Sequence, residues 1–350
     1  MSSDSETLHY LSMSNSSCKD DTNIGCMNHS CIDEKNIGRN ASVITSAVLF
    51  GTGVFGNVIA LIILLKHKRT FKHKISVFYV LASGLVLNDL LGKCLVSAPV
   101  FVCYALNKTL KGIADGNNSM CNSFAFLMAF FALTSIFILL AMALECCLSL
   151  GYPYFYQRHI TKRKGLLCFT AVYLFCLIFS SLPLLGFGQN VQYCPGTWCF
   201  IQMTSDSSKN VFSYAVLYAT LMGVLIFAVM VCNILAMKNL IKMQKTAKRT
   251  MRSNSLYSSE DIKPGGQNTE ESGHLILLVI MTVSFMVCSL PFMVRAYTAT
   301  FAPDKDEAAD LIAIRFLSVH SIIDPWLFII FRTSVFRTTC RKVYDKLWPG

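Results

Sequence analysis

Among the ionisable side chains within long apolar stretches of this sequence, Asp89, Lys93, Arg315 and Asp324 most need an explanation. A charged side chain inside a membrane is costly unless it faces the interior of a helix bundle and finds a partner there. If the stretches are helices, Lys93 and Arg315 lie in the outer half of the bundle at comparable depth. Ser318 follows Arg315 by one helical turn, and Ser97 follows Lys93 by one turn. Two cations beside hydroxyls in apolar walls predict a site for the carboxylate of a lipid-like ligand.

Each cation also has a purely structural explanation. Asp89 precedes Lys93 by four residues, a spacing that favours an ion pair within one helix. Arg315 has no acidic residue three or four positions away, although Asp310 lies five residues before it. Arg295 lies near the end of its apolar stretch, where its side chain can reach the membrane surface. A ligand contact is therefore the favoured interpretation of Arg315, while an internal ion pair stays open for Lys93.

The residue types that are absent narrow the chemistry further. The third apolar stretch has no Asp or Glu over residues 121–144 that could pair with an amine ligand, and the seventh has no Lys for a retinal Schiff base. The sequence shows no catalytic constellation and no zinc-ligand spacing of Cys and His. We therefore expect no enzyme activity, no metal and no other cofactor, and a ligand that is an anion with a long apolar body.

The elements that position these residues are predicted to be membrane-spanning helices. Of the 350 residues, 53% are apolar and only 15% are charged, whereas soluble domains carry about a quarter charged residues. A crossing needs about 20 mainly apolar residues, and lipid forces such a segment to be helical. Seven stretches qualify, and they predict an all-α membrane protein with a seven-transmembrane helix bundle: 41–65, 76–104, 120–149, 165–187, 211–237, 274–301 and 310–331.

Basic residues predict how the bundle is oriented. With the N-terminus outside, the loops 66–75, 151–164 and 238–272 and the segment from 332 hold 21 of the 31 Lys and Arg residues. Cytoplasmic loops are the ones enriched in these residues, so the net charge of +11 reports topology rather than nucleic-acid binding. All five glycosylation sequons fall on the predicted outer side, although Asn40 stands close to the membrane. The predicted glycosylation sites are therefore Asn15, Asn28, Asn107 and Asn117.

Three regions follow from this topology: an extracellular segment over residues 1–40, the bundle over 41–331, and a cytoplasmic region over 332–350. The last region mixes apolar and basic residues in a way that favours a short amphipathic helix on the inner leaflet. Cys340 lies in it and is either palmitoylated or a plain thiol.

Two other features need an explanation. Gly51, Gly53 and Gly56 spell G-x-G-x-x-G, but the motif lies inside a predicted span with no preceding strand, so close helix packing explains it better than dinucleotide binding. Most of the 15 cysteines stand singly in apolar runs, where a thiol acts as a small apolar group. Two predicted disulfides remain, both on the outer side: Cys121 with Cys199, and Cys194 with one of Cys18, Cys26 and Cys31, of which Cys31 is preferred.

Several motifs resemble those of rhodopsin-like G-protein-coupled receptors. They are Gly56-Asn57 in the first span, residues 87–90 in the second, Pro183 in the fourth, 288–291 in the sixth and 324–328 in the seventh. The Asp-Arg-Tyr sequence that usually ends the third span of such receptors is replaced by Glu145-Cys146-Cys147. This departure from the family pattern puts the usual arginine-based lock of the inactive state in doubt, although Glu145 stands where the acid is expected.

Within that family the chain is similar to prostanoid receptors over nearly its whole length. Residues 196–200 resemble their second-loop motif, and 311–325 resemble their seventh-span motif. The resemblance implies that Arg315 and Lys93 bind a prostaglandin carboxylate, that Tyr104, Ser318 and Trp198 line the pocket or its lid, and that the receptor sits in the plasma membrane. It also implies coupling to the stimulatory G protein and a rise in cyclic AMP.

The stretches around Lys93, Glu145 and Cys194 resemble the branch that responds to prostaglandin D(2). The branches for prostaglandin E(2) and prostacyclin remain alternatives, and an organic-anion transporter is the alternative of another class. Such transporters show repeated halves and paired broken helices, neither of which is visible in this sequence.

A ligand-driven switch between two arrangements of the helices is the expected mechanism. Pro291 and the Asp324-Pro325 pair are its predicted movable elements, and Asp89 and Glu145 its predicted polar switch residues. The basic loops 151–164 and 238–272 are predicted to receive the G protein.

Overall fold

The structure is a computed structural model that describes residues 33–37, 42–70, 77–203, 209–254, 266–301 and 306–332. Within the helices, the side chains of residues 67–70, 162, 209–212, 247–254, 266–272, 299–301 and 332 are not described. Several predictions lie outside the described residues: Asn15, Asn28, Asn40, Cys31, Cys340 and the amphipathic helix after residue 332.

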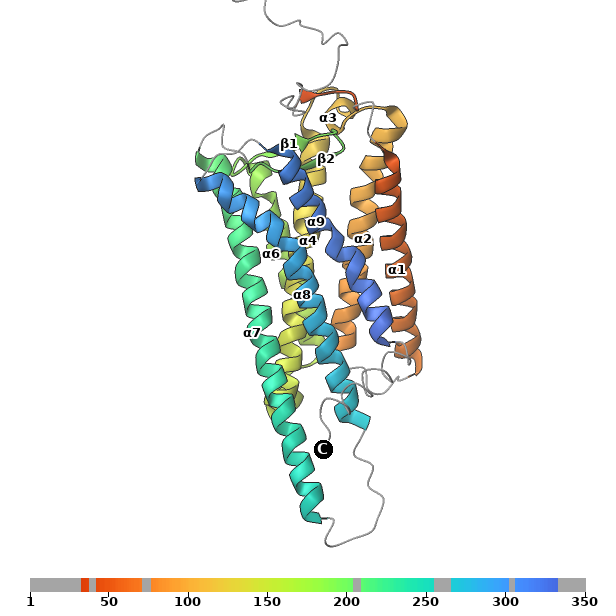
Figure 1. Cartoon of the computed structure of the whole chain (residues 1–350), viewed down its shortest axis with the longest axis vertical. Helices are drawn as coiled ribbons and strands as arrows, with labels where there is room; N and C mark the ends of the chain where they lie inside the picture. Colours follow the sequence, from red (N-terminus) through yellow and green to blue (C-terminus); the bar gives the residue numbers. More distant parts are fainter. Residues whose placement is uncertain are drawn as a thin grey trace, which may run out of the picture. The chain divides into compact units, whose positions relative to one another are not determined.

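The described part of the chain contains seven helices that are long and apolar enough to cross a membrane. They are α1 (Val43–Thr70), α2 (Val77–Leu106), α4 (Ser119–Gly151), α6 (Lys162–Ser181), α7 (Lys209–Asn254), α8 (Gly266–Phe301) and α9 (Glu307–Arg332). They form an all-α bundle (Figure 1), so the predicted fold class is confirmed. The helix α7 continues well beyond its apolar part, into the predicted loop 238–272, because the residues there are mostly good helix formers.

Four short helices and strands connect the long helices: α3 (Leu110–Ile113), α5 (Pro153–His159), β1 (Asn190–Tyr193) and β2 (Trp198–Ile201); a short 3-10 helix, η2 (Leu182–Leu185), ends α6. The strands β1 and β2 form an antiparallel hairpin in which Asn190 faces Ile201 and Tyr193 faces Trp198. We call the end of the bundle that carries this hairpin the hairpin end, and the opposite end, where α4 stops, the far end (Figure 1).

The turn of the hairpin requires a glycine. Gly196 has a φ of +94°, a conformation that glycine adopts at little cost. A Cβ atom at this position would also collide with Cγ2 of Thr109. The turn is therefore packed directly against the connection between α2 and α4.

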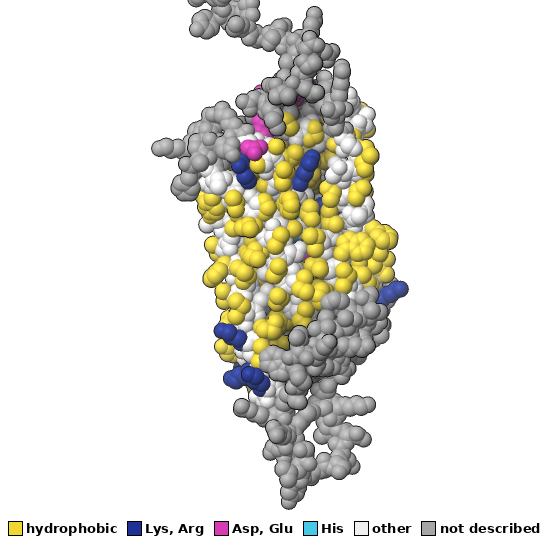
Figure 2. All heavy atoms as spheres, viewed as in Figure 1, with side chains coloured by type: hydrophobic (Ala, Val, Ile, Leu, Met, Phe, Trp, Pro, Cys, Tyr) yellow, Lys and Arg dark blue, Asp and Glu magenta, His cyan; other side chains and the backbone are white. Residues whose placement is uncertain are grey.

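The central helix is α4, which contacts α2, α6, α7, α8 and the hairpin. Its interior side chains are buried, whereas the outward faces of other helices expose large apolar residues such as Phe55, Leu166 and Phe227. Apolar side chains cover most of the described face in Figure 2, and basic side chains lie toward its upper and lower ends. This distribution is typical of a bundle whose outer surface meets lipid.

Buried amides fasten neighbouring helices to one another. Asn57 of α1 donates to the carbonyl of Ser321 on α9 at 3.1 Å, and Asn88 of α2 donates to Ser135 Oγ on α4 at 2.9 Å. Asn233 of α7 donates to Thr282 Oγ1 on α8 at 2.9 Å. Side-chain hydrogen bonds of this kind stabilise helix contacts in lipid, and they fix how the helices carrying the charged residues face one another.

Candidate ligand-binding site

The ammonium of Lys93 reaches across from α2 to α9. Lys93 is 9% exposed, and its Nζ donates a hydrogen bond of 3.0 Å to the carbonyl of Ser318. Asp89 instead accepts a hydrogen bond of 2.8 Å from Ser135 Oγ on α4. No ion pair within 4.0 Å joins Lys93 to Asp89 in the described chain. The alternative of an internal pair is therefore not observed, and Lys93 places its charge at α9.

Arg315 lies on α9 one helical turn before Ser318, and its side chain is half-buried. Its Cζ atom lies 5.9 Å from the centroid of the Trp198 ring on β2, a cation–π arrangement. The edge of Phe124 on α4 holds the same indole, with ring centroids 5.9 Å apart. Arg315 therefore faces the hairpin, and Trp198 is part of its immediate surroundings.

The nearest acidic candidate for Arg315 in the sequence has another partner. Asp310, which is 1% exposed, accepts a hydrogen bond of 2.6 Å from Arg295 Nε on α8. Arg295 also donates to the carbonyl of Asp306 at 3.3 Å. The interpretation of Arg295 as a side chain that reaches the membrane surface is wrong, because α8 and α9 adjoin here and Asp310 is within reach. Among the described residues no carboxylate pairs with Arg315.

A cavity of about 60 Å³ lies beside Lys93, between α2, α4 and α9. Its lining includes Ser97, Ser318, Asp89 and Ser135. Pockets that enclose drug-sized ligands measure roughly 300–1,000 Å³. Helices or side chains must therefore move apart before a lipid-like ligand can occupy this region, which agrees with the expected switch between two arrangements.

The remaining predicted pocket residues differ in their surroundings. Ser318 Oγ donates to the carbonyl of Arg315 at 2.8 Å within α9, so its backbone rather than its hydroxyl meets Lys93. Tyr104 is half-buried near the hairpin end of α2 and packs against the core. None of the contacts described for Tyr104 reaches Arg315 or Lys93.

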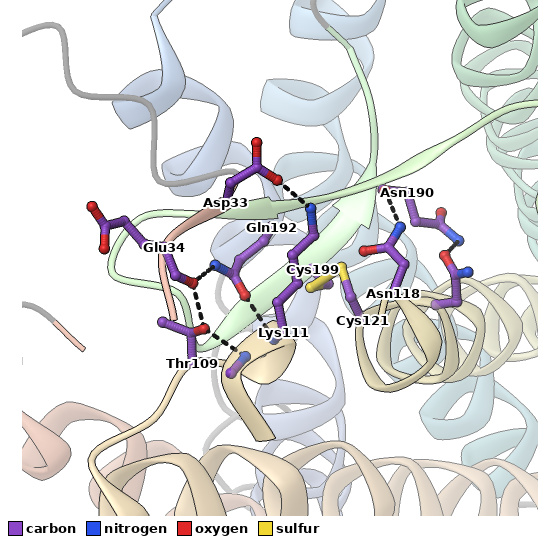
Figure 3. The surroundings of a disulfide bond; sticks show 11 residues. Asp33, Glu34, Thr109, Lys111, Asn118, Cys121, Asn190, Gln192 and Cys199 are labelled. Atoms are coloured by element: carbon purple, nitrogen blue, oxygen red, sulfur yellow. Dashed lines mark hydrogen bonds and ion pairs between the residues drawn. A yellow bond between two sulfur atoms is a disulfide. The ribbon is translucent and has the colours of Figure 1, made fainter. Parts of the chain in front are cut away.

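The hairpin is attached covalently and by hydrogen bonds. The predicted disulfide between Cys121 of α4 and Cys199 of β2 is present, as Figure 3 shows. Gln192 of β1 donates to the carbonyl of Glu34 at 3.0 Å and accepts from the backbone N–H of Lys111 at 3.0 Å. The segment over residues 33–37 is thereby held against the hairpin, and the two together form a lid over α4.

Three further features belong to the hairpin end of the bundle. Cys194 is also disulfide-bonded, and its partner is not among the described cysteines, so the pairing with Cys31 stays a prediction. Burial, with the nearby charge of Asp310, raises the pKa of Tyr193 well above its usual range, and its hydroxyl donates to the carbonyl of Ile201 at 3.0 Å. The predicted glycosylation sites Asn107 and Asn117 are both exposed at this end.

The predicted switch residues lie along the bundle axis. Glu145, near the far end of α4, accepts a hydrogen bond of 2.6 Å from the hydroxyl of Tyr156 on α5, a contact that the sequence did not predict. Both carboxylate oxygens of Asp324 are buried without a hydrogen-bond partner in the part of the chain that the structure covers. Pro291 and Pro325 lie inside α8 and α9, where each removes a backbone hydrogen bond and weakens the helix locally.

Sequence reasoning also missed a contact at the far end. The ring of His274 on α8 stacks on Phe78 of α2, with centroids 4.4 Å apart and an interplanar angle of 12°. Its Nε2 lies 3.1 Å from the hydroxyl of Tyr79. Three residues thus join the ends of α2 and α8. Nothing in their spacing indicates the contact, because it depends on how two distant helices pack.

The sequence of the chain is similar to those of known membrane receptors. Residues 56–328 match the sequence model of the 7 transmembrane receptor (rhodopsin family). The chain is 47% identical to the prostaglandin D2 receptor of Bos taurus over 330 residues, covering 88% of this chain and 91% of that one. Identity to the prostaglandin D2 receptor of Homo sapiens is also 47%, covering 88% and 91%.

Receptors named for another prostaglandin are nearly as similar. Identity to the prostaglandin E2 receptor EP2 subtype of Canis lupus familiaris is 46% over 305 residues, covering 83% of this chain and 82% of that one. Among solved structures, squid rhodopsin superposes with a TM-score of 0.65 at 15% identity, covering 87% of this chain and 79% of that one. At this identity the likeness concerns the fold alone.

Proposed function

Because this chain belongs to the rhodopsin family of seven-transmembrane receptors, and within it to the prostaglandin receptors, we propose that it is a receptor for prostaglandin D(2). It couples to the stimulatory G protein and raises cyclic AMP. Members of the family are receptors rather than enzymes, and they reside in the plasma membrane. We place the hairpin end outside the cell and the far end in the cytoplasm, with residues 1–40 extracellular and 332–350 cytoplasmic.

One observation carries the proposal: the guanidinium of Arg315 lies over the ring of Trp198 and has no carboxylate partner within the described residues. A half-buried guanidinium of this kind is ready to receive an anion, because its planar donors match the two oxygens of a carboxylate. The ammonium of Lys93 bonds to Ser318, about 4.5 Å further along the axis of α9. One carboxylate can therefore engage both cations, while the rest of the ligand packs against apolar walls.

Prostaglandin E(2) and prostacyclin remain the alternative ligands, since relatives named for prostaglandin E2 are 46% identical. Membership of a receptor family removes the support for an organic-anion transporter. The test is to express the chain and measure cyclic AMP against prostaglandin D(2), prostaglandin E(2) and a prostacyclin analogue. We expect prostaglandin D(2) to act at the lowest concentration. A lower half-maximal concentration for either rival would reassign the ligand, and a calcium rise without cyclic AMP would reassign the G protein.

The far end has a surface suited to a G protein. Tyr152 and Tyr154, at the start of α5, are 65% and 89% exposed. A hydrogen bond from the hydroxyl of Tyr156 to Glu145 joins α5 to α4. Exposed aromatic side chains on a rigid element are typical of protein interfaces. Together with the basic residues of 151–164 and 238–272, they support docking of the G protein here.

Replacing His274 by alanine is expected to raise cyclic AMP in the absence of ligand. Stacking and one hydrogen bond contribute about 1–2 kcal/mol to the contact of α8 with α2. Losing them shifts the ratio of active to inactive receptor roughly fivefold to thirtyfold. The measurement is basal cyclic AMP normalised to receptor number.

The matched control is Phe126→Ala. Phe126 stacks on Phe130 with ring centroids 5.9 Å apart and an interplanar angle of 14°, but both residues belong to α4, so the pair joins no two spans. Its loss should not raise basal signalling. An unchanged basal signal in His274→Ala would show that the contact does not hold the inactive arrangement.

A further inference from the structure

Gly53 lies where α1 meets both α2 and α9. A Cβ atom at this position would stand 3.2 Å from Cγ of Lys93, 3.3 Å from Cε of Lys93 and 3.3 Å from Cγ1 of Ile322. These distances are tighter than ordinary Cβ contacts, so a methyl group at this position requires the side chain of Lys93 or Ile322 to shift by a few tenths of an ångström. The backbone of α1 therefore supports the stem of Lys93 along its length.

The supported stem ends at a defined point. From Gly53 the Lys93 side chain continues to the carbonyl of Ser318, where Nζ donates at 3.0 Å. A lysine side chain is a flexible four-carbon stem whose rotamers are costly to order. The backbone of α1 at Gly53 and the neighbouring helix α9 limit the rotamers of this stem, and in the observed one the charge lies at the carbonyl of Ser318.

The three glycines of the G-x-G-x-x-G stretch have different neighbours. A Cβ atom at Gly56 would lie 2.9 Å from Nε1 of Trp326, and its three nearest neighbours all belong to that side chain, so this glycine packs α1 against α9. A Cβ atom at Gly51 would have no neighbour within 4 Å among the residues that the structure describes. Gly53 is thus distinguished from the other two by its contact with Lys93.

We propose that Gly53 is a positioning residue for ligand recognition. Its missing Cβ keeps the ammonium of Lys93 at the height on α9 where the acid group of the ligand binds. The inference rests on the proposed function, in which Lys93 contacts the carboxylate. It predicts that substitution at Gly53 weakens recognition of the acid group specifically and leaves recognition of the apolar body of the ligand unchanged.

The experiment compares two agonists: the prostaglandin that is most potent in the cyclic AMP assay, and its analogue with a primary alcohol in place of the carboxylate. The readout is the ratio of their half-maximal concentrations. Loss of a charge-assisted hydrogen bond lowers affinity about tenfold or more. We therefore expect Gly53→Ala and Lys93→Met each to reduce the preference for the acid about tenfold.

Three variants separate positioning from general packing. Gly51→Ala should leave the preference for the acid unchanged. Gly56→Ala should lower thermal stability but also leave the preference for the acid unchanged. The double variant Gly53→Ala/Lys93→Met should equal Lys93→Met alone, since both substitutions remove the same interaction. If Gly53→Ala does not reach the membrane, Gly53→Ala/Ile322→Ala removes the crowding from α9 and leaves only the contact with Lys93.

The results distinguish the role of Gly53 from the proposed role of Lys93 in binding the ligand. An unchanged preference in Lys93→Met overturns the proposed role of Lys93 itself. A reduced preference in Lys93→Met with a wild-type preference in Gly53→Ala overturns only the role of Gly53. Equal losses for both agonists in Gly53→Ala would also overturn it, because they would mean that the glycine serves packing alone.

Discussion

Replacing Arg315 by alanine is expected to lower the potency of the prostaglandin by about a hundredfold or more, because removing one partner of a buried charge pair costs roughly 2–5 kcal/mol. The substitution leaves the carboxylate of the ligand facing Trp198 without a donor, and it removes the cation from above that ring. The measurement is the half-maximal concentration for cyclic AMP, with radioligand binding to count receptors. The alcohol analogue should lose far less.

Two further variants serve as controls for Arg315→Ala. Arg315→Lys keeps the charge but not the planar donors that match a carboxylate, so its potency should fall between those of the wild type and Arg315→Ala. Arg295→Ala removes an arginine from the same end, but it breaks the ion pair with the buried Asp310 and should reduce the amount of folded receptor instead. A wild-type response from Arg315→Ala would refute the docking of the carboxylate on α9.

Replacing Cys199 by serine is expected to remove most high-affinity binding sites from the cell surface. The disulfide with Cys121 closes a sequence separation of 78 residues, and a cross-link of that span stabilises a fold by about 4 kcal/mol. The neighbouring residue on β2 is Trp198, which lies against Arg315. Losing the bond therefore lowers stability and also frees one wall of the site. Saturation binding on intact cells measures the number of sites that remain.

The controls are cysteines of the bundle that form no bridge. Cys94 and Cys168 are free and exposed on the bundle, so Cys94→Ser and Cys168→Ser should bind as the wild type does. Cys121→Ser, alone or combined with Cys199→Ser, should match Cys199→Ser because each breaks the same bond. Normal surface binding by Cys199→Ser would show that hydrogen bonds alone hold the lid.

The spans were predictable because lipid imposes a minimum length and an apolar composition on each of them. Neither constraint applies outside the membrane, so the continuation of α7 to Asn254 was not predicted. The hairpin was missed for another reason: β1 and β2 have four residues each, which is too short for the polar–apolar alternation of β1 to stand out from a loop. Such strands form because they are packed onto α4.

In the site, the sequence identified which side chains carry charge and at what depth, but not what each one contacts. Residue spacing predicts partners only within one helix, and it suggested Asp89 as the ion-pair partner of Lys93. The observed partners, Ser318 for Lys93 and Arg295 for Asp310, come from neighbouring helices. Those contacts depend on how each helix is rotated about its axis, which only the packed bundle determines.

The central helix α4 connects the hairpin at one end of the bundle with α5 at the other end. It has 33 residues, about 50 Å at 1.5 Å per residue, and no proline at which it could bend. The hairpin is bonded to it at Cys121, and Tyr156 of α5 is bonded to it at Glu145. A tilt of α4 imposed at the hairpin is therefore expected to move α5 at the far end. A spectroscopic probe on α5 should consequently register reduction of a disulfide at the opposite end.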